Sequence, residues 1–159
     1  MTVLRATLLG GVDGVITSFA IVVAAYGGGV AQRSVLALGL ASVAADGLSM
    51  GISEYLSNYS ERVATNKTRS YLQPLYAGLA CFGSFVLFGL VPLLTYVATD
   101  GVILSATMFA LVELMLLGAG RTVFSGEPLL RGLMQTALLG SCAGAVAYGV
   151  GYAVAIQQR

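Results

Sequence analysis

Five long apolar stretches, each interrupted by only a few polar residues, make up most of the chain. They cover residues 8–29, 34–59, 75–97, 102–120 and 129–156. Since a helix needs about 20 mainly apolar residues to cross the hydrocarbon core of a bilayer, each stretch is long enough to span a membrane. The pattern therefore predicts an all-α membrane protein with five transmembrane helices.

The composition agrees with this pattern. Of the 159 residues, 57% are hydrophobic and 9% are charged, and the mean hydropathy is +0.88. Five spans use roughly 100 residues, so we expect residues 1–159 to form a single transmembrane domain with short connections in a lipid bilayer. The net charge of +1 and the lack of a dense basic stretch argue against a nucleic-acid partner.

Lysine and arginine are distributed unevenly between the two sides that five spans define. The side of the N-terminus receives six of them: Arg5, Arg62, Lys67, Arg69, Arg121 and Arg131. The other side receives only Arg33 and Arg159. Because short loops rich in these residues stay in the cytosol, we expect a cytosolic N-terminus and a C-terminus that is outside or luminal.

Glycines recur four residues apart in three of the predicted helices. The pairs are Gly10–Gly14, Gly47–Gly51 and Gly140–Gly144. This spacing lets two helix backbones approach closely inside a bilayer, within one chain or between two chains. An odd number of helices also means that a symmetric pathway, if the protein has one, would need a second copy of the chain.

Acidic residues inside the predicted spans are the main sign of function. Four of the seven carboxylates lie there, namely Asp13, Asp46, Glu54 and Glu113, and no Lys or Arg lies in the interior of the spans to neutralise them. A carboxylate at the centre of a membrane helix costs about 2.5–3.5 kcal/mol and usually marks an ion or proton pathway. Either a bound cation or protons would supply the missing positive charge. The structural alternative is a set of protonated, hydrogen-bonded carboxyls that only pack.

The spacing of these residues predicts which of them lie together. Asp46, Met50 and Glu54 are four apart and form one stripe on the second helix. A rise of about 1.5 Å per residue places Asp13 near the height of Met50, and Glu113 near that of Asp46, which we expect it to face. Oxygen ligands with a thioether favour softer divalent ions such as Fe²⁺, and the sequence contains no His for a tight zinc or copper site.

Three segments resemble the vacuolar iron transporter family, which includes the nodulin-like membrane proteins of plants. They begin with Asp13-Gly-Val-Ile-Thr-Ser-Phe, with Leu48-Ser-Met-Gly-Ile-Ser-Glu-Tyr and with Pro128-Leu-Leu-Arg-Gly-Leu-Met. The resemblance implies a homodimer of five-helix subunits that moves Fe²⁺, and often Mn²⁺, out of the cytosol in exchange for protons. It also implies that Asp13 and Met50 are intramembrane metal ligands and that Glu54 is the acidic residue of the same motif.

The chain departs from the family pattern in two places. Founding members carry a long cytosolic metal-binding domain between the second and third helices, for which the interval 60–73 is too short, so this chain resembles a short form. Asp46 stands where the family usually has a small residue. It is an additional carboxylate that we interpret, with Glu113, as a second metal stop or a proton carrier.

These observations lead to one expected function and two rivals. We expect a transporter of divalent metal, not an enzyme, with Fe²⁺ or Mn²⁺ as substrate, protons as the exchanged ion and no permanently bound cofactor. The membrane would be vacuolar or another endomembrane in a eukaryote, and the plasma membrane in a prokaryote. The rivals are a proton-coupled exporter of small organic cations, which would need a wide aromatic cavity, and a membrane scaffold without transport.

Overall fold

A computed structural model describes residues 2–65 and 71–157 of the chain. It contains five helices in these ranges: α1 (Thr2–Gly27), α2 (Gln32–Ala64), α3 (Leu72–Ala98), α4 (Ile103–Ser125) and α5 (Leu129–Gln157). All five are long and apolar enough to cross a membrane, and the described ranges contain no strand. The prediction of an all-α, multi-pass membrane protein with five transmembrane helices is confirmed.

The helices are longer than several of the apolar stretches that predicted them. Helix α1 begins six residues before the first stretch, and α2 and α4 each continue five residues beyond theirs. The added turns contain Arg5, Arg62 and Arg121. Charged residues of this kind end an apolar stretch without ending a helix, because arginine has a good helix propensity.

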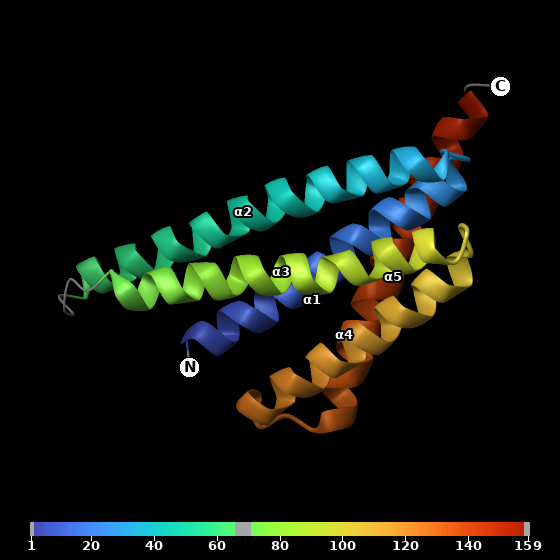
Figure 1. Ribbon diagram of the computed structural model, residues 1–159. Helices are drawn as coiled ribbons and strands as arrows, with labels where there is room; N and C mark the ends of the chain where they lie inside the picture. The colour runs from blue at the N-terminus through green and yellow to red at the C-terminus, as the bar shows by residue number, and fades with distance from the viewer. Residues whose placement is uncertain (1, 66–70, 158–159) are drawn as a thin grey trace.

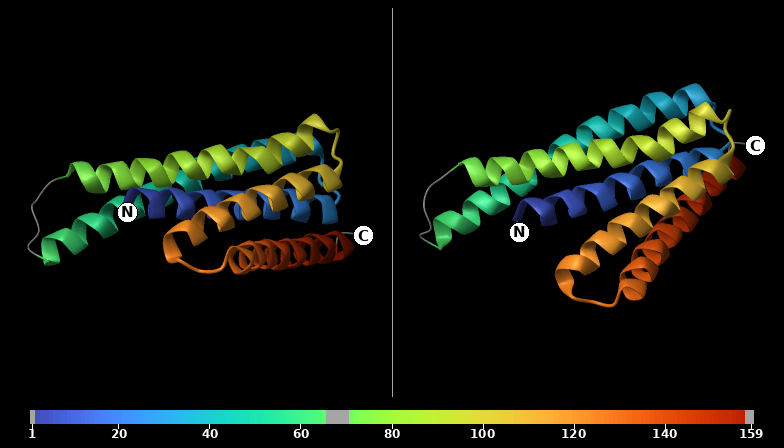
Figure 2. Two further views of the ribbon diagram at one scale, coloured as in Figure 1. Left: turned by 90° about the horizontal axis from the view of Figure 1, so that it is seen from below. Right: turned by 60° about the horizontal axis from the view of Figure 1, so that its bottom comes forward.

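Helix α1 is the centre of the bundle and contacts all four of the other helices. Its main partner is α3, which also packs along α2, while α5 packs against α1 and α4. Figures 1 and 2 show α4 and α5 diverging from α2 and α3 toward the end of the molecule that carries the N-terminus. The bundle is therefore closed at one end and splayed at the other.

Glycines permit the close packing of α1 on α3. A Cβ atom at Gly10 would collide with the carbonyl oxygen of Cys81, and one at Gly14 would collide with that of Phe85. Where α2 meets α3, a Cβ atom at Gly51 would likewise lie too close to the carbonyl oxygen of Gly78, at 2.9 Å. The glycine pairs expected to allow close helix contact do so within one chain, as membrane packing by small residues requires.

Two tight connections hold the closed end together. The α1–α2 connection contains Gly29 with φ +65°, and the α3–α4 connection contains Asp100 with φ 52° and Gly101 with φ +84°. Gln32 at the start of α2 donates from Nε2 to the carbonyl oxygens of Tyr96 (3.2 Å) and Val97 (3.1 Å) at the end of α3. Both carbonyls also accept backbone N–H groups of the α3–α4 turn, Tyr96 from Gly101 (2.9 Å) and Val97 from Asp100 (3.3 Å), so the Gln32 bonds tie the start of α2 to a capped end of α3.

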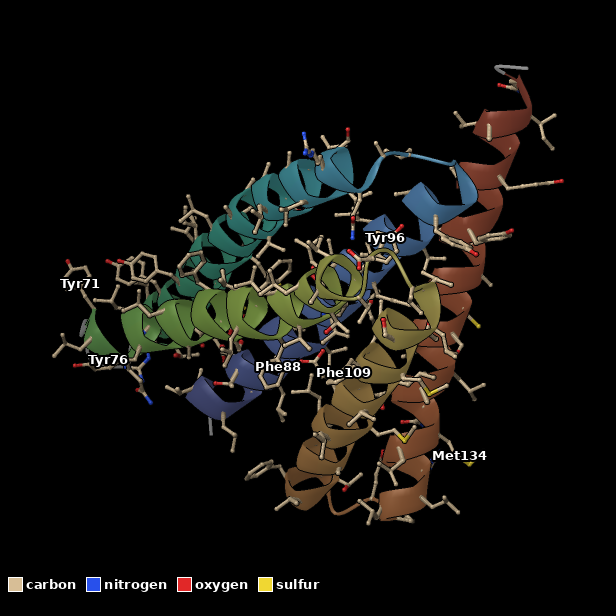
Figure 3. The ribbon with its side chains drawn as sticks, turned by 45° about the vertical axis from the view of Figure 1, so that its right-hand side comes forward. Tyr71, Tyr76, Phe88, Tyr96, Phe109 and Met134 are labelled. Carbon is tan, nitrogen blue, oxygen red and sulfur yellow. The ribbon has the colours of Figure 1, made fainter. Side chains whose placement is uncertain are left out.

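Tyrosines mark both ends of the bundle. Tyr55, Tyr59 and Tyr71 stack in sequence where α2 ends and α3 begins. Figure 3 shows Tyr71 and Tyr76 at this end of α3 and Tyr96 near its other end, and Tyr148 stacks on Tyr152 in α5. Tyrosine is enriched at membrane–water boundaries, so this placement fits a bundle that lies across a bilayer.

The N-terminal end of the bundle carries most of the basic residues in the described part of the chain. Arg5, Arg62 and Arg131 lie in the first or last turns of helices there, Arg121 lies just before the last turn of α4, and Arg33 lies at the closed end. The described residues do not include Lys67, Arg69 and Arg159, on which the predicted orientation also depends. A cytosolic N-terminus stays a prediction that rests on this bias.

Candidate metal pathway

The stripe predicted on α2 is continuous and longer than expected. Asp46, Met50 and Glu54 lie on one face of the helix, with Ser42 four residues before Asp46 and Asn58 four residues after Glu54. The Ser42 hydroxyl donates to the Asp46 carboxylate. Asn58 donates from Nδ2 to Glu54 Oε1 at 2.8 Å and to the Glu54 carbonyl oxygen at 2.8 Å. Each carboxylate is thus oriented by a neutral donor one turn away.

Asp13 of α1 lies beside this stripe. The Asp13 and Asp46 carboxylates lie close enough to repel each other across the boundary between α1 and α2. The Cys81 thiol on α3 lies within electrostatic range of both Asp13 and Glu54, and Met50 packs against a cluster that contains Cys81 and Ala6. Two helices therefore bring four of the five expected site residues to one side of the molecule.

Asp13 and Asp46 are exposed on the surface of a single subunit, whereas Met50 and Glu54 are half-buried. No basic side chain neutralises any of them, because the one ion pair within residues 2–65 and 71–157 joins Arg121 to Glu127 at 3.4 Å, outside this group. Two repelling carboxylates without a countercharge form a region of negative potential that attracts cations.

Glu113 lies apart from the other four residues. Its side chain is only 8% exposed, and its Oε2 atom has no hydrogen-bond partner. The expectation that it faces Asp46 is wrong for one subunit, because α2 and α4 make no contact in the described parts of the chain. Similar depth along two helices does not make two residues neighbours, since α1 and α3 occupy the space between them.

One subunit alone does not bring together enough ligands for a typical metal site. Among the residues that the structure describes, no three His, Cys, Asp or Glu side chains lie close enough together to hold one metal ion. A divalent ion at Asp13 would therefore need other ligands, such as the Met50 thioether, water or a second copy of the chain.

Sequence reasoning missed Ser42 and Asn58 as the partners of the two stripe carboxylates. The available signal was the spacing, because residues 42, 46, 50, 54 and 58 are all four apart and therefore neighbours along a helix face.

Comparison with known proteins places this arrangement in a family. The model of the VIT family matches residues 4–72 and 62–152, which together include α2, α3 and α4 and most of α1 and α5. The chain belongs to the VIT family. The two matched segments overlap at 62–72, between α2 and α3, which agrees with a short form that lacks a segment at this point.

Two relatives in the VIT family align with almost the whole chain. The "Vacuolar iron transporter" of Toxoplasma gondii is 26% identical over 219 residues, which cover 92% of this chain and 72% of the relative. The "Vacuolar iron transporter homolog 4" of Arabidopsis thaliana is 32% identical over 165 residues, which cover 92% of this chain and 81% of the relative. Both names describe transporters.

Proposed function

We propose that this chain is a subunit of a divalent metal transporter that moves Fe²⁺, or Mn²⁺, out of the cytosol in exchange for protons. The observation that carries the proposal is that Asp13 lies within electrostatic range of Asp46, whose stripe on α2 also carries Met50 and Glu54, while no basic side chain in the described residues pairs with these carboxylates. The names of the two VIT relatives support iron as the substrate. The unpaired negative charge supports cation transport over the scaffold alternative.

The same groups account for coupling to protons. Asp13, Glu54 and Met50 bind the ion from the cytosolic side, and Asp46 lies one turn beyond Met50 and two turns beyond Glu54 along α2. A carboxylate oxygen that holds a proton cannot also coordinate a metal ion, so protons arriving from an acidic far side release the metal. Glu113 lies off this route, and we assign it to proton binding rather than to a shared metal site with Asp46.

We further propose that a second copy of the chain covers the face that carries Asp13 and Asp46. Exposed carboxylates facing lipid would cost several kcal/mol, so this face needs a polar neighbour. Beside Asp46 the exposed surface of α2 carries Ser49 and Ser53, and small polar residues of this kind allow close contact between membrane helices. Two copies would also supply the ligands that one subunit lacks.

Metal uptake into proteoliposomes tests the function. Purified protein with an acidic lumen should accumulate Fe²⁺, and Asp13→Asn should lower the rate at least about tenfold, since the loss even of a residue that only supports a ligand typically costs about 10–100-fold. Asp100→Asn is the matched control, because Asp100 lies in the α3–α4 turn, where asparagine tolerates the same positive φ. Uptake that is unchanged in Asp13→Asn would overturn the proposal at its central residue.

A further inference from the structure

A cavity of about 640 Å³ is lined mainly by α1 and by the diverging pair α4 and α5, at the splayed end of the bundle. Its walls are mainly apolar and include Leu9 of α1, Leu117 and Phe124 of α4 and Leu139 of α5. Leu9, Phe124 and Leu139 are all exposed in one subunit. The cavity is large enough for a substantial part of an organic ligand, because ligand sites commonly measure about 300–1,000 Å³.

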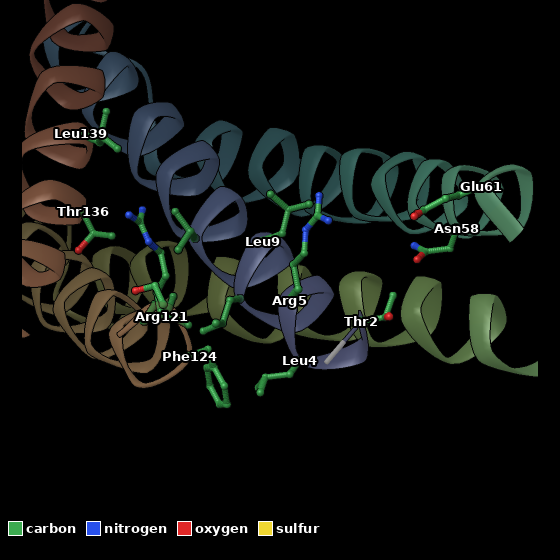
Figure 4. Close-up of a pocket in the computed structure, with 14 residues that line it drawn as sticks. Thr2, Leu4, Arg5, Leu9, Asn58, Glu61, Arg121, Phe124, Thr136 and Leu139 are labelled. Carbon is green, nitrogen blue, oxygen red and sulfur yellow. The ribbon is translucent and has the colours of Figure 1, made fainter. Parts of the chain in front are cut away.

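Two arginines add positive charge to the lining of this apolar cavity. Arg5 of α1 and Arg121 of α4 line it, and the lining contains one carboxylate, that of Glu61. Figure 4 shows Arg121 and Arg5 along the α4 and α1 side of the cavity, with Glu61 and Asn58 at its other end on α2. The two guanidinium groups outnumber the one carboxylate of the lining, and although Glu127 pairs with Arg121, Arg5 has no ion pair within the described residues, so this part of the cavity favours an anion over a bare divalent cation.

The guanidinium groups keep donors available for such an anion. Arg121 donates from Nη2 to Gln135 Oε1 at 2.9 Å and to Glu127 Oε2 at 3.4 Å, which fixes its position between α4 and α5. Both bonds use one nitrogen, whereas arginine offers five N–H donors. Arg5 is exposed and has no hydrogen bond or ion pair within the described residues. Arginine with free donors binds phosphate oxygens in a bidentate manner.

We propose that this cavity holds an anionic phospholipid of the leaflet at the N-terminal end, with its phosphate at Arg5 and Arg121. An apolar wall under a basic rim matches a molecule with acyl chains under a charged headgroup. Basic pockets between transmembrane helices on the cytosolic side bind acidic headgroups, and anionic lipids are concentrated in that leaflet. The lipid would fill the wedge on the α4–α5 side of α1, next to the face proposed for the second subunit.

Native mass spectrometry of the full-length protein in detergent tests this proposal without any metal, so it is independent of transport. Equal amounts of palmitoyl-oleoyl phosphatidylglycerol and phosphatidylcholine are the probes. We expect wild-type protein to retain phosphatidylglycerol preferentially and Arg5→Gln to lose about fivefold in that preference, the effect of one basic residue near an anionic headgroup. Arg33→Gln, at the closed end of the bundle, should keep it.

Two further variants make the test robust. Arg121→Gln should weaken binding similarly, but it also removes the bond to Gln135 and can loosen α4 from α5, so Arg5 is the primary position. Leu139→Trp fills the apolar part of the cavity without changing charge, and it should reduce retention of both lipids. An unchanged preference in Arg5→Gln, or an equal loss in Arg33→Gln, would refute the site.

The same mass spectra also report how many subunits are present, so they can identify a second chain as the occupant of the cavity. If Arg5→Gln and Leu139→Trp dissociate a dimer and leave the lipid count per subunit unchanged, a second chain fills the cavity and the lipid proposal is wrong. Displacement of phosphatidylglycerol by sn-glycerol 3-phosphate would likewise overturn it in favour of a soluble phosphoester.

Discussion

Asn58 is the residue whose role follows most directly from its contacts. Its side-chain amide bonds both the carboxylate and the carbonyl oxygen of Glu54, at 2.8 Å in each case. Partners of this kind orient metal ligands, and their loss typically lowers metal affinity about 10–100-fold.

We therefore expect Asn58→Ala to weaken Fe²⁺ or Mn²⁺ binding at least about tenfold, as measured by calorimetry on the detergent-solubilised protein. Ser57→Ala is the matched control, because Ser57 is exposed and lies one residue away on α2. An affinity for metal that is equal in the two variants would mean that Glu54 is not a ligand.

Glu113 allows a second prediction at this scale. A buried oxygen without a hydrogen-bond partner costs about 1–3 kcal/mol, whereas an apolar side chain of similar shape at the same position does not. Glu113→Leu should therefore raise the apparent unfolding temperature of the protein in detergent while lowering proton-driven metal uptake. A lower unfolding temperature would show that the Glu113 carboxyl stabilises the fold, and uptake at the wild-type rate would remove it from the proton route.

At the scale of the helices, the contact between α1 and α3 depends on glycine. At Gly14 an added methyl group meets the backbone of Phe85, which cannot move aside as a flexible side chain can. At Gly83, on α3, the same methyl group meets nothing within 4 Å. Gly14 and Gly83 are therefore a matched pair of positions at which to test an added methyl group.

Gly14→Ala should lower the free energy of unfolding by about 2 kcal/mol or more, since overpacking a tight contact forces backbone shifts. Gly83→Ala should raise it by up to about 1 kcal/mol, the gain in helix propensity. Thermal unfolding followed by circular dichroism measures both. Equal effects of the two substitutions would contradict the close approach of α1 and α3.

The elements also show how far the sequence could predict the structure. Long apolar stretches identified all five helices, because spanning a bilayer demands both length and apolarity. The ends at Thr2, Ala64 and Ser125 were missed, since polar turns stay helical beyond the apolar stretch. Spacing along α2 placed Asp46, Met50 and Glu54 on one face, but sequence gives no measure of which helices are neighbours. For that reason the expectation that Glu113 faces Asp46 was wrong within one subunit.

For the whole molecule, the proposed homodimer makes a prediction that compares two adjacent residues. Ser49 lies on the small polar face of α2 beside Asp46, and Leu48 points away from it with an exposed fraction of 55%. With Cys142 replaced by serine, Ser49→Cys should be joined to its counterpart by a short bis-maleimide reagent, and Leu48→Cys should not. Cross-linked dimer on a denaturing gel is the measurement. The reverse result would place the second subunit on another face.

Since α2 and α4 make no direct contact in the described part of the chain, we expect the two groups of carboxyls to act independently on stability within a subunit. Residues without shared neighbours usually have additive effects, within about 0.5 kcal/mol. A double-mutant cycle on Asp46→Asn and Glu113→Gln should therefore give a coupling free energy near zero for stability. If the same cycle on transport rate gives a large coupling, the two sites communicate through a movement of whole helices around α1, and the static bundle is one of at least two working states.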